Sequence, residues 1–165
     1  MVNVICVSGS VGSGKTTIAK KIAKLLKFEY LDVKKLIDSN KNVVCGFDKK
    51  RKTKEIDVNK LNKILIKIID NSVNEVIVID SHLSHYLPAK YVDVCVVCEC
   101  PDLKLFKKRL VERKYSKLKI KENLEMEILE VCLVEATENK HEVVVVDSSK
   151  RINYKNVIKE IKRRL

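Results

Sequence analysis

The chain has 165 residues, of which 45% are hydrophobic and 34% are charged, and its formal net charge at pH 7 is +12. This length fits one domain, and the hydrophobic content is sufficient for a core. No run of about 18 apolar residues is present, which excludes a membrane-spanning helix, and the apolar N-terminal run is too short for a signal peptide. We therefore expect a soluble, cytoplasmic protein with a single domain over residues 1–165.

The first predicted elements flank a glycine-rich loop. A β-branched apolar run at residues 2–8 predicts a strand, and helical apolar spacing predicts a helix at residues 14–27. Three of the four glycines in the chain, Gly9, Gly12 and Gly14, lie between them. Glycine is used where the backbone takes a positive φ or comes close to another group.

This loop has the pattern Gly-x-x-x-x-Gly-Lys-Thr of a P-loop, which ends at Lys15 and Thr16. Its backbone N–H groups and the helix N-terminus form an anion site, Lys15 reaches the β- and γ-phosphates of a nucleotide, and the Thr16 hydroxyl ligates Mg²⁺. The alternative is a glycine and serine turn that merely precedes a helix. The position of the full pattern between a strand and a helix favours nucleotide binding.

A polar insertion follows a short strand at residues 28–31 and a helix at residues 32–39. It continues as far as an amphipathic helix at residues 57–71, which Asp57 can cap. We expect the insertion, at about residues 31–56, to be the place where a phosphate acceptor docks. It carries Asp32, Asp48, Lys50 and Arg51.

The strand predicted at residues 75–80 ends in an aspartate. In a P-loop fold, Asp80 would hold Mg²⁺ directly or through water, although an aspartate after a strand can also be a turn residue. His82 would position water or act as a base, and a structural role is its alternative. We expect His85 to be structural.

Three cysteines accompany the strand predicted at residues 92–99. The spacing of Cys95, Cys98 and Cys100 is compatible with zinc, but residues three apart on a strand point to opposite faces. We therefore expect buried free thiols.

A helix predicted at residues 102–114 carries Arg109 and Arg113 on one face. Phosphoryl transfer needs cations on the transferred group and on the acceptor, so the basic segment at about residues 112–122 suits a short lid. A solvated helix end is the alternative. The remaining predicted elements are a helix at residues 118–138, a strand at 142–147 and a helix at 153–164.

Alternating strands and helices predict a three-layer α/β P-loop fold with a parallel five-stranded sheet and a site at the carboxyl ends of the strands. The net positive charge favours polyanions such as nucleotides or RNA. No RNA-binding motif with interleaved aromatic residues is recognisable, so contact with RNA would depend on charge or on a partner.

The sequence resembles the adenylate kinase isoenzyme 6 family in its archaeal form. The resemblance spans about residues 1–138 and rests on the stretches GSVGSGKTT, YLDV, GFDKKRKT, VIDSHLSHYLP, ERKYS and KIKENLEMEILEVCLVEA. It implies a fold of nucleoside monophosphate kinase type with a short lid, Mg²⁺-dependent transfer of the ATP γ-phosphate to AMP, and a slow ATPase activity.

The resemblance also implies partners and site residues. Family members are linked to late maturation of the small ribosomal subunit and its 16S rRNA, and they pair transiently with small-subunit ribosomal protein eleven, so pre-30S particles are an implied partner. By position, the residues that hold ATP are Gly12, Ser13, Gly14, Lys15, Thr16, Thr17 and Arg113, with adenine near Ser148 and Ser149. The implied catalytic residues are Lys15, Asp80, His82 and Arg113. From the loop, the strand end and the insertion themselves, we expect Thr16 and Asp80 as metal ligands and Asp32, Asp48, Arg51 and Arg109 as acceptor ligands.

Two positions depart from the family pattern. Lys114 stands where a glycine usually follows the lid arginine, and Asp38 stands where an arginine often binds the acceptor phosphate, which makes Arg51 a candidate for that role. Three interpretations stay open: a metabolic kinase that binds AMP, an ATPase of ribosome assembly in which kinase activity is incidental, and a kinase of a small metabolite or RNA. The resemblance argues against the third.

Overall fold

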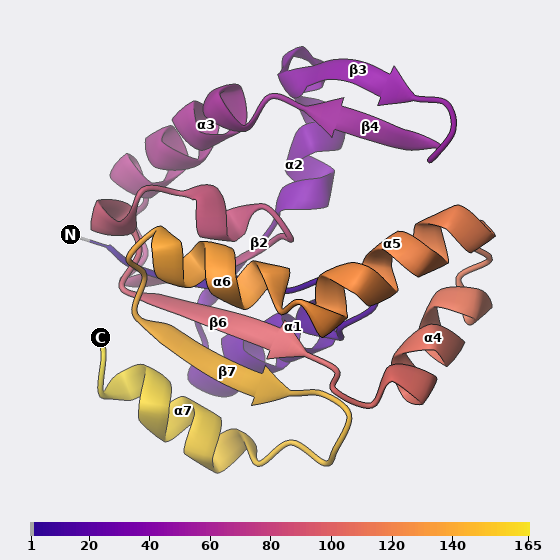
Figure 1. Ribbon diagram of the computed structural model, residues 1–165. Helices are drawn as coiled ribbons and strands as arrows, with labels where there is room; N and C mark the ends of the chain where they lie inside the picture. Colours follow the sequence, from indigo (N-terminus) through magenta and orange to yellow (C-terminus); the bar gives the residue numbers. More distant parts are fainter. Residues whose placement is uncertain (1) are drawn as a thin grey trace.

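The computed structural model describes residues 2–165 as a sheet covered by helices on both faces (Figure 1). The main sheet has five parallel strands in the order β2-β5-β1-β6-β7. These strands are β1 (Asn3–Ser8), β2 (Glu29–Asp32), β5 (Val76–Asp80), β6 (Val94–Glu99) and β7 (Val143–Asp147). The predicted three-layer fold is confirmed.

The helices divide between the two faces and one end of the sheet. Those on one face are α1 (Lys15–Leu26) and α7 (Tyr154–Lys162), and those on the other are α2 (Val33–Ser39), α3 (Val58–Asp70) and α6 (Val131–Glu138). Beyond the carboxyl end of β6 lie α4 (Leu103–Glu112) and α5 (Lys117–Ile128). Short 3-10 helices are η1 (Lys41–Val43), η2 (Ser84–Tyr86) and η3 (Ala89–Tyr91). Within residues 2–165, no helix combines the length and the apolar character needed to span a bilayer.

The strand sequences are apolar on both faces because both faces are covered. In β1, Val4 and Cys6 pack with α2, α3 and α6, whereas Ile5 and Val7 pack with α1 and α7. A third cluster, built on Phe106 and other residues, joins α4 to α5. The sheet is therefore fixed from both sides, and its carboxyl end is left to the loops that form the site.

The cysteines Cys95, Cys98 and Cys100 are buried free thiols, and each packs in a different core cluster. Cys95 and Cys98 lie on opposite faces of the sheet, as the period of a strand requires. The three sulfurs therefore cannot converge on one zinc ion.

Two regions differ from the sequence predictions. The helix predicted at residues 118–138 is two helices, because Glu130 takes a φ of 49° and turns the chain between α5 and α6. The insertion contains an antiparallel hairpin, which comprises β3 (Val44–Asp48) and β4 (Thr53–Ile56). Both strands are short and half-exposed or exposed, so they lack the apolar run from which a strand is recognised.

Candidate active site

The P-loop joins β1 to α1 in a conformation that its glycines permit. Gly12 and Gly14 have φ angles of 95° and 90°, in the region where a side chain would be strained. At Gly9, a Cβ atom would collide with the carbonyl oxygen of Cys98 in β6. The loop can therefore turn closely over the end of the sheet, at the N-terminus of α1 where backbone N–H groups bind anions.

Lys15, the first residue of α1, is coupled to the neighbouring strand end. Burial lowers the pKa of Lys15, and the nearby Asp80 carboxylate opposes this shift because it stabilises the ammonium. The phosphates of a nucleotide would stabilise the ammonium further. The structure thus brings together Lys15 and Asp80, which the sequence assigned to one site.

Asp80 ends β5 with only 6% of its surface exposed. Its Oδ2 accepts a hydrogen bond of 2.7 Å from the Tyr30 hydroxyl. Its Oδ1 is buried without a hydrogen-bond partner among residues 2–165. A free carboxylate oxygen beside the P-loop fits a ligand of Mg²⁺, and the exposed Thr16 hydroxyl in the first turn of α1 is of the right chemical type for a second.

Two histidines after β5 have different surroundings. The His82 side chain is exposed, yet partial desolvation and the positive charge of Lys15 lower its pKa to about 4, so the neutral imidazole dominates at pH 7. His85 is 1% exposed, and its Nδ1 lies 2.6 Å from Ser8 Oγ and its Nε2 2.9 Å from Glu135 Oε2. His85 is therefore structural, whereas His82 can reach water.

A cavity of about 390 Å³ opens beside the P-loop. It is enclosed by the loop, the start of α1, the end of α4 and the segment after β7, and its lining includes Gly12, Gly14, Thr17, Arg109, Arg113 and Ser148. Four predicted ATP-binding residues and the predicted neighbour of adenine, Ser148, thus lie around one space. Its volume suits a small ligand such as a nucleotide.

Arg109 lies on this side of the site and not with the insertion. Its Nη1 donates to Ser148 Oγ at 3.0 Å and its Nη2 to the Ser148 carbonyl at 2.8 Å. The expected acceptor role of Arg109 therefore does not fit its position. The reason is the packing of α4 against the P-loop, since a Cβ atom on Gly12 would meet Leu110 of the same helix.

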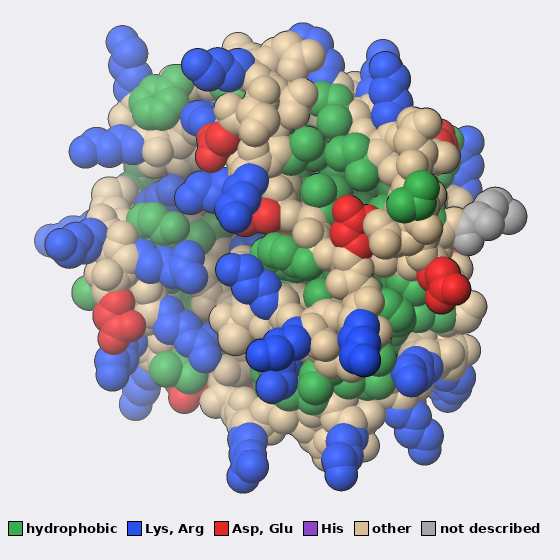
Figure 2. Space-filling view, turned by 180° about the vertical axis from the view of Figure 1, so that it is seen from behind, with side chains coloured by type: hydrophobic (Ala, Val, Ile, Leu, Met, Phe, Trp, Pro, Cys, Tyr) green, Lys and Arg blue, Asp and Glu red, His purple; other side chains and the backbone are tan. Residues whose placement is uncertain are grey.

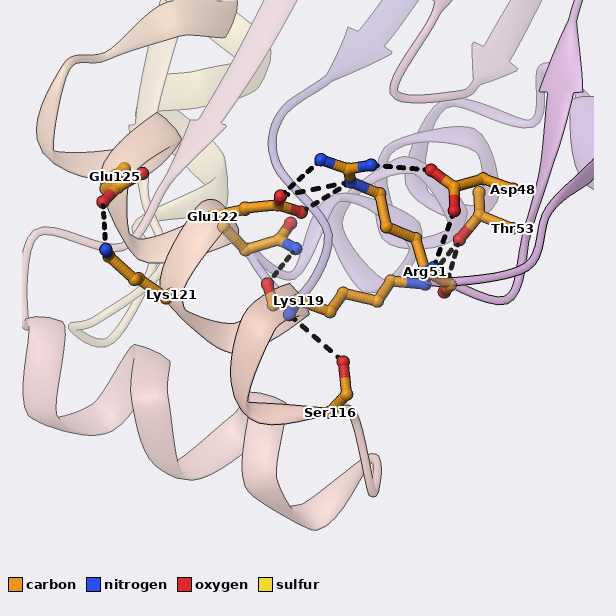
Figure 3. A network of polar contacts seen from close by, with 9 residues as sticks. Asp48, Arg51, Thr53, Ser116, Lys119, Lys121, Glu122 and Glu125 are labelled. Atoms are coloured by element: carbon orange, nitrogen blue, oxygen red, sulfur yellow. Dashed lines mark hydrogen bonds and ion pairs between the residues drawn. The ribbon is translucent and has the colours of Figure 1, made fainter.

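The insertion closes on α5 through Arg51 (Figure 3). Arg51 Nη1 lies 2.7 Å from Asp48 Oδ2, and its Nη2 lies 2.6 Å from Glu122 Oε1 on α5. A second contact joins Lys119 Nζ to Thr53 Oγ1 at 3.1 Å. The hairpin is thus held to the part of the predicted lid that lies in α5.

Two aspartates of the insertion have other partners. Asp38 forms an ion pair of 2.7 Å with Lys54 of β4. Asp32 caps α2 by accepting the Lys35 N–H at 3.2 Å, and it is the register partner of Asp80. Asp32 therefore lies at the site, but its side chain already has a structural role.

The segment predicted as a lid, at about residues 112–122, consists of a short turn at residues 113–116 and the first half of α5. Arg113 is the C-cap residue of α4 and lines the cavity beside the P-loop. Lys114 has a φ of 56°, in the left-handed region that favours glycine. The backbone thus explains the glycine that the family usually has at this position.

Known proteins are similar to this chain in sequence or in fold. Residues 5–130 match a family described as "AAA domain". The chain is 36% identical over 159 residues to a "Putative adenylate kinase" of Thermococcus onnurineus, which covers 96% of this chain and 81% of that protein. It is 38% identical over 141 residues to the "Adenylate kinase isoenzyme 6 homolog" of Caenorhabditis elegans, with 86% and 76% covered.

The chain belongs to the adenylate kinase isoenzyme 6 family. Solved structures of more distant kinases have the same fold as this family member. Shikimate kinase from Acinetobacter baumannii in complex with shikimate aligns with a TM-score of 0.62 at 16% identity, covering 99% of this chain and 92% of that one. A gluconokinase from Sinorhizobium meliloti aligns with a TM-score of 0.54 at 12% identity, covering 96% and 89%. These alignments concern the fold alone.

Three contacts of this adenylate kinase isoenzyme 6 family member were not predicted from its sequence. They are the bonds from Tyr30 to Asp80, from Arg51 to Glu122, and from Ser10 to Glu127. Each joins residues at least 50 positions apart, so no local pattern indicates it. The only available signal was that these residues fall in or near the stretches that carry the family resemblance.

Proposed function

We propose that the protein is a Mg²⁺-dependent kinase that transfers the γ-phosphoryl group of ATP to AMP. The observation that carries this proposal is the pairing of the Lys15 ammonium with the nearby Asp80 carboxylate. The buried Oδ1 of Asp80 has no protein partner among residues 2–165. A phosphate-binding loop, an ammonium group and a free carboxylate oxygen are the parts that a P-loop kinase places around MgATP. The relatives with adenylate kinase in their names support AMP as the acceptor.

We assign ATP to the P-loop and the cavity beside it. The proposed ligands are those expected from the sequence, namely Gly12, Ser13, Gly14, Lys15, Thr16, Thr17 and Arg113. We add Arg109 and Ser148, because they line the same cavity and are hydrogen-bonded to each other.

The proposed reaction needs alignment and charge neutralisation more than proton transfer. An oxygen of the AMP phosphate attacks the γ-phosphorus, and the bond between that phosphorus and the bridging oxygen to the β-phosphate breaks. Because the attacking oxygen is already anionic, it needs no general base. Lys15 and Arg113 would stabilise the charge on the transferred group, and Mg²⁺ held by Thr16 and Asp80 would neutralise the β- and γ-phosphates.

We place AMP between the P-loop and the insertion, with Asp32, Asp48 and Arg51 as its proposed neighbours. Arg51 is the proposed ligand of the acceptor phosphate, because a guanidinium binds phosphate through two parallel hydrogen bonds. Its present contact with Glu122 has that geometry, because Nε and Nη2 each donate to one carboxylate oxygen, whereas Nη1 gives Asp48 a single bond. A phosphate would take the place of at least one of them.

Product analysis tests this function. The purified protein is incubated with ATP and Mg²⁺, with and without AMP, and the nucleotides are separated by ion-exchange chromatography. We expect two ADP for each ATP consumed, and only when AMP is present. Formation of ADP and inorganic phosphate at the same rate with and without AMP would contradict the kinase assignment.

We also propose ATP hydrolysis as a second activity, because His82 is exposed, neutral at pH 7 and two residues from Asp80. Such an imidazole can orient an attacking water. The family resemblance further supports a role in late maturation of the small-subunit 16S rRNA, through transient binding of small-subunit ribosomal protein eleven. Figure 2 shows Lys and Arg side chains spread over a whole face of the molecule, and with a net charge of +12 they would attract RNA without sequence preference.

Binding experiments separate this second role from the first. The protein is immobilised and exposed to the ribosomal protein with ADP, with a non-hydrolysable ATP analogue, or without nucleotide. Binding that changes with the nucleotide supports an assembly role. Equal binding in all three states, together with AMP-dependent ADP formation, would leave only the kinase.

A further inference from the structure

Glu127 is a buried carboxylate that the proposed reaction does not use. It lies near the end of α5 and is 9% exposed. One of its oxygens accepts a hydrogen bond from the Ser10 hydroxyl in the P-loop, and the other accepts the backbone N–H of Cys100. Cys100 directly follows β6, so Glu127 joins the P-loop to the neighbouring strand end.

The surroundings make Glu127 costly to bury. Removing a carboxylate from water is unfavourable unless donors replace the water. Glu99 and Glu130 line the same small space as Glu127, and burial and the charges of Glu130 and Glu127 raise the pKa of Glu99. A residue that served packing alone would be apolar here, so the hydrogen bonds to Ser10 and Cys100 are the useful feature of Glu127.

A second carboxylate reaches the same loop from α6. Glu135 contacts His85 Nε2 at 2.9 Å, and His85 Nδ1 contacts Ser8 Oγ at 2.6 Å. Ser8 is the last residue of β1, directly before the P-loop. Helices α5 and α6 therefore hold both the residue that precedes the loop, Ser8, and the second residue of the loop, Ser10.

The helix that carries Glu127 also contacts the acceptor insertion. Glu122 of α5 binds Arg51, and Lys119 of α5 binds Thr53 in the same hairpin. The first half of α5 thus contacts the insertion, and the last turn of α5 contacts the P-loop. A shift of α5 would move both contacts together.

We propose that Glu127 is a positioning residue for phosphate binding: it holds Ser10 against the end of β6 and thereby fixes the P-loop in the conformation that binds the nucleotide. This inference rests on the proposed function, since it takes the P-loop as the ATP site. Glu127 does not touch the phosphates. Its effect is on how well the loop is organised before ATP arrives.

ATP affinity in matched variants tests the proposal. Glu127→Ala removes both hydrogen bonds, and we expect ATP to bind about tenfold more weakly, which corresponds to the loss of about one well-formed hydrogen bond. Glu127→Gln should bind ATP within about twofold of the wild type, because its amide can accept from the Cys100 N–H and donate to Ser10. The control is Glu125→Ala, an exposed position paired with Lys121, which should leave the affinity unchanged.

Two further variants remove the same hydrogen bond from the Ser10 side, so the test does not depend on whether Glu127→Ala folds. Ser10→Ala should weaken ATP binding about as much as Glu127→Ala. The double variant should be no weaker than either single one, because both remove the same bond. The KM for AMP should change by less than about twofold in Ser10→Ala, since the insertion keeps its contacts with α5.

The outcomes are distinguishable. If the wild type does not bind ATP, the proposed function fails. If the wild type binds ATP and Glu127→Ala binds it equally well, the positioning role fails while the function stands. Equal losses in the Gln and Ala variants, or additive losses in the double variant, would also overturn the positioning role, because the bond between Ser10 and Glu127 would not be the cause.

Discussion

The Tyr30 hydroxyl on the edge strand β2 donates a 2.7 Å hydrogen bond to Asp80 Oδ2 on the neighbouring strand β5. Burial and the bond to Asp80 raise the pKa of Tyr30, so its hydroxyl remains a donor at neutral and moderately alkaline pH. The bond fixes the rotation of the carboxylate and leaves Oδ1 as the oxygen for the Mg²⁺ that we propose. Tyr30 would therefore act on the proposed metal site through Asp80.

Tyr30→Phe should lower kcat/KM for MgATP by about tenfold, because the hydrogen bond to a charged group is worth about 1.5 to 3 kcal/mol and its loss frees the carboxylate to rotate. The Mg²⁺ concentration for half-maximal rate should also rise. Initial rates over a Mg²⁺ titration measure both. Tyr91→Phe, in the 3-10 helix η3 that precedes β6, is the control and should match the wild type. An unchanged Mg²⁺ dependence in Tyr30→Phe would show that Tyr30 does not orient Asp80.

His82→Ala should slow ATP hydrolysis at least tenfold more than it slows AMP phosphorylation, because water must be oriented whereas the AMP phosphate oxygen is already anionic. Parallel assays of inorganic phosphate and of AMP-dependent ADP measure the two rates. His85→Ala is not a suitable control, since His85 is buried. Equal losses in both assays would contradict a role of His82 that is specific to hydrolysis.

The pH dependence of hydrolysis gives an independent check on His82. Desolvation and the charge of Lys15 lower the pKa of His82 from 6.5 to about 4. The neutral imidazole is the proposed active form, so the rate should be level at neutral pH and should fall only as the pH approaches the pKa of about 4. His82→Ala should lose this acid limb. A limb that persists in the variant would belong to another group.

Arg51→Ala should raise the KM for AMP by about tenfold, because a bidentate guanidinium contact with the phosphate is lost. Glu122→Gln should leave this KM unchanged or lower it, because the carboxylate competes with the phosphate for Arg51. Steady-state kinetics at saturating ATP measure both variants. Lys49→Ala removes a charge from the same hairpin turn and is the control.

A different result would change the role of Arg51. If Arg51→Ala and Glu122→Gln raise the KM for AMP equally, the pair acts as a contact that closes the hairpin on α5. In that case the acceptor phosphate has another ligand.

Lys114→Gly should stabilise the protein by about 0.5 to 1 kcal/mol, because glycine adopts a φ of 56° without the strain that a side chain brings. The same substitution inside α4, Lys107→Gly, should destabilise it by about 1 kcal/mol. Urea unfolding followed by circular dichroism measures both. Destabilisation of similar size at the two positions would contradict the strain at Lys114.

Local patterns predicted the parts of the site that are continuous in sequence. The P-loop is recognisable because its glycines and Lys15 are adjacent in the chain, and Asp80 because it directly ends an apolar run. The break at Glu130 was not predictable, because a left-handed φ is usually marked by glycine and the chain has none there. The β3–β4 hairpin gave no strand signal for another reason, because its strands are short and lack an apolar run.

Contacts between distant elements were beyond the reach of the sequence. The spacing of Arg109 and Arg113 predicted that they share a helix, but the side of the site that Arg109 faces depends on how α4 packs against the P-loop. The bond between Ser10 and Glu127 joins residues 117 positions apart. Such contacts follow from the tertiary fold, which a periodic pattern does not specify.

The most direct test of the central claim follows the γ-phosphoryl group itself. The protein is incubated with Mg²⁺ and ATP labelled at the γ-phosphate, with AMP in excess, and the labelled products are separated. The wild type should transfer the label to AMP and yield labelled ADP, and Asp80→Asn should lose at least about 99% of this rate, since it removes the proposed metal ligand. Label found only in inorganic phosphate, at a rate that AMP does not alter, would contradict the account.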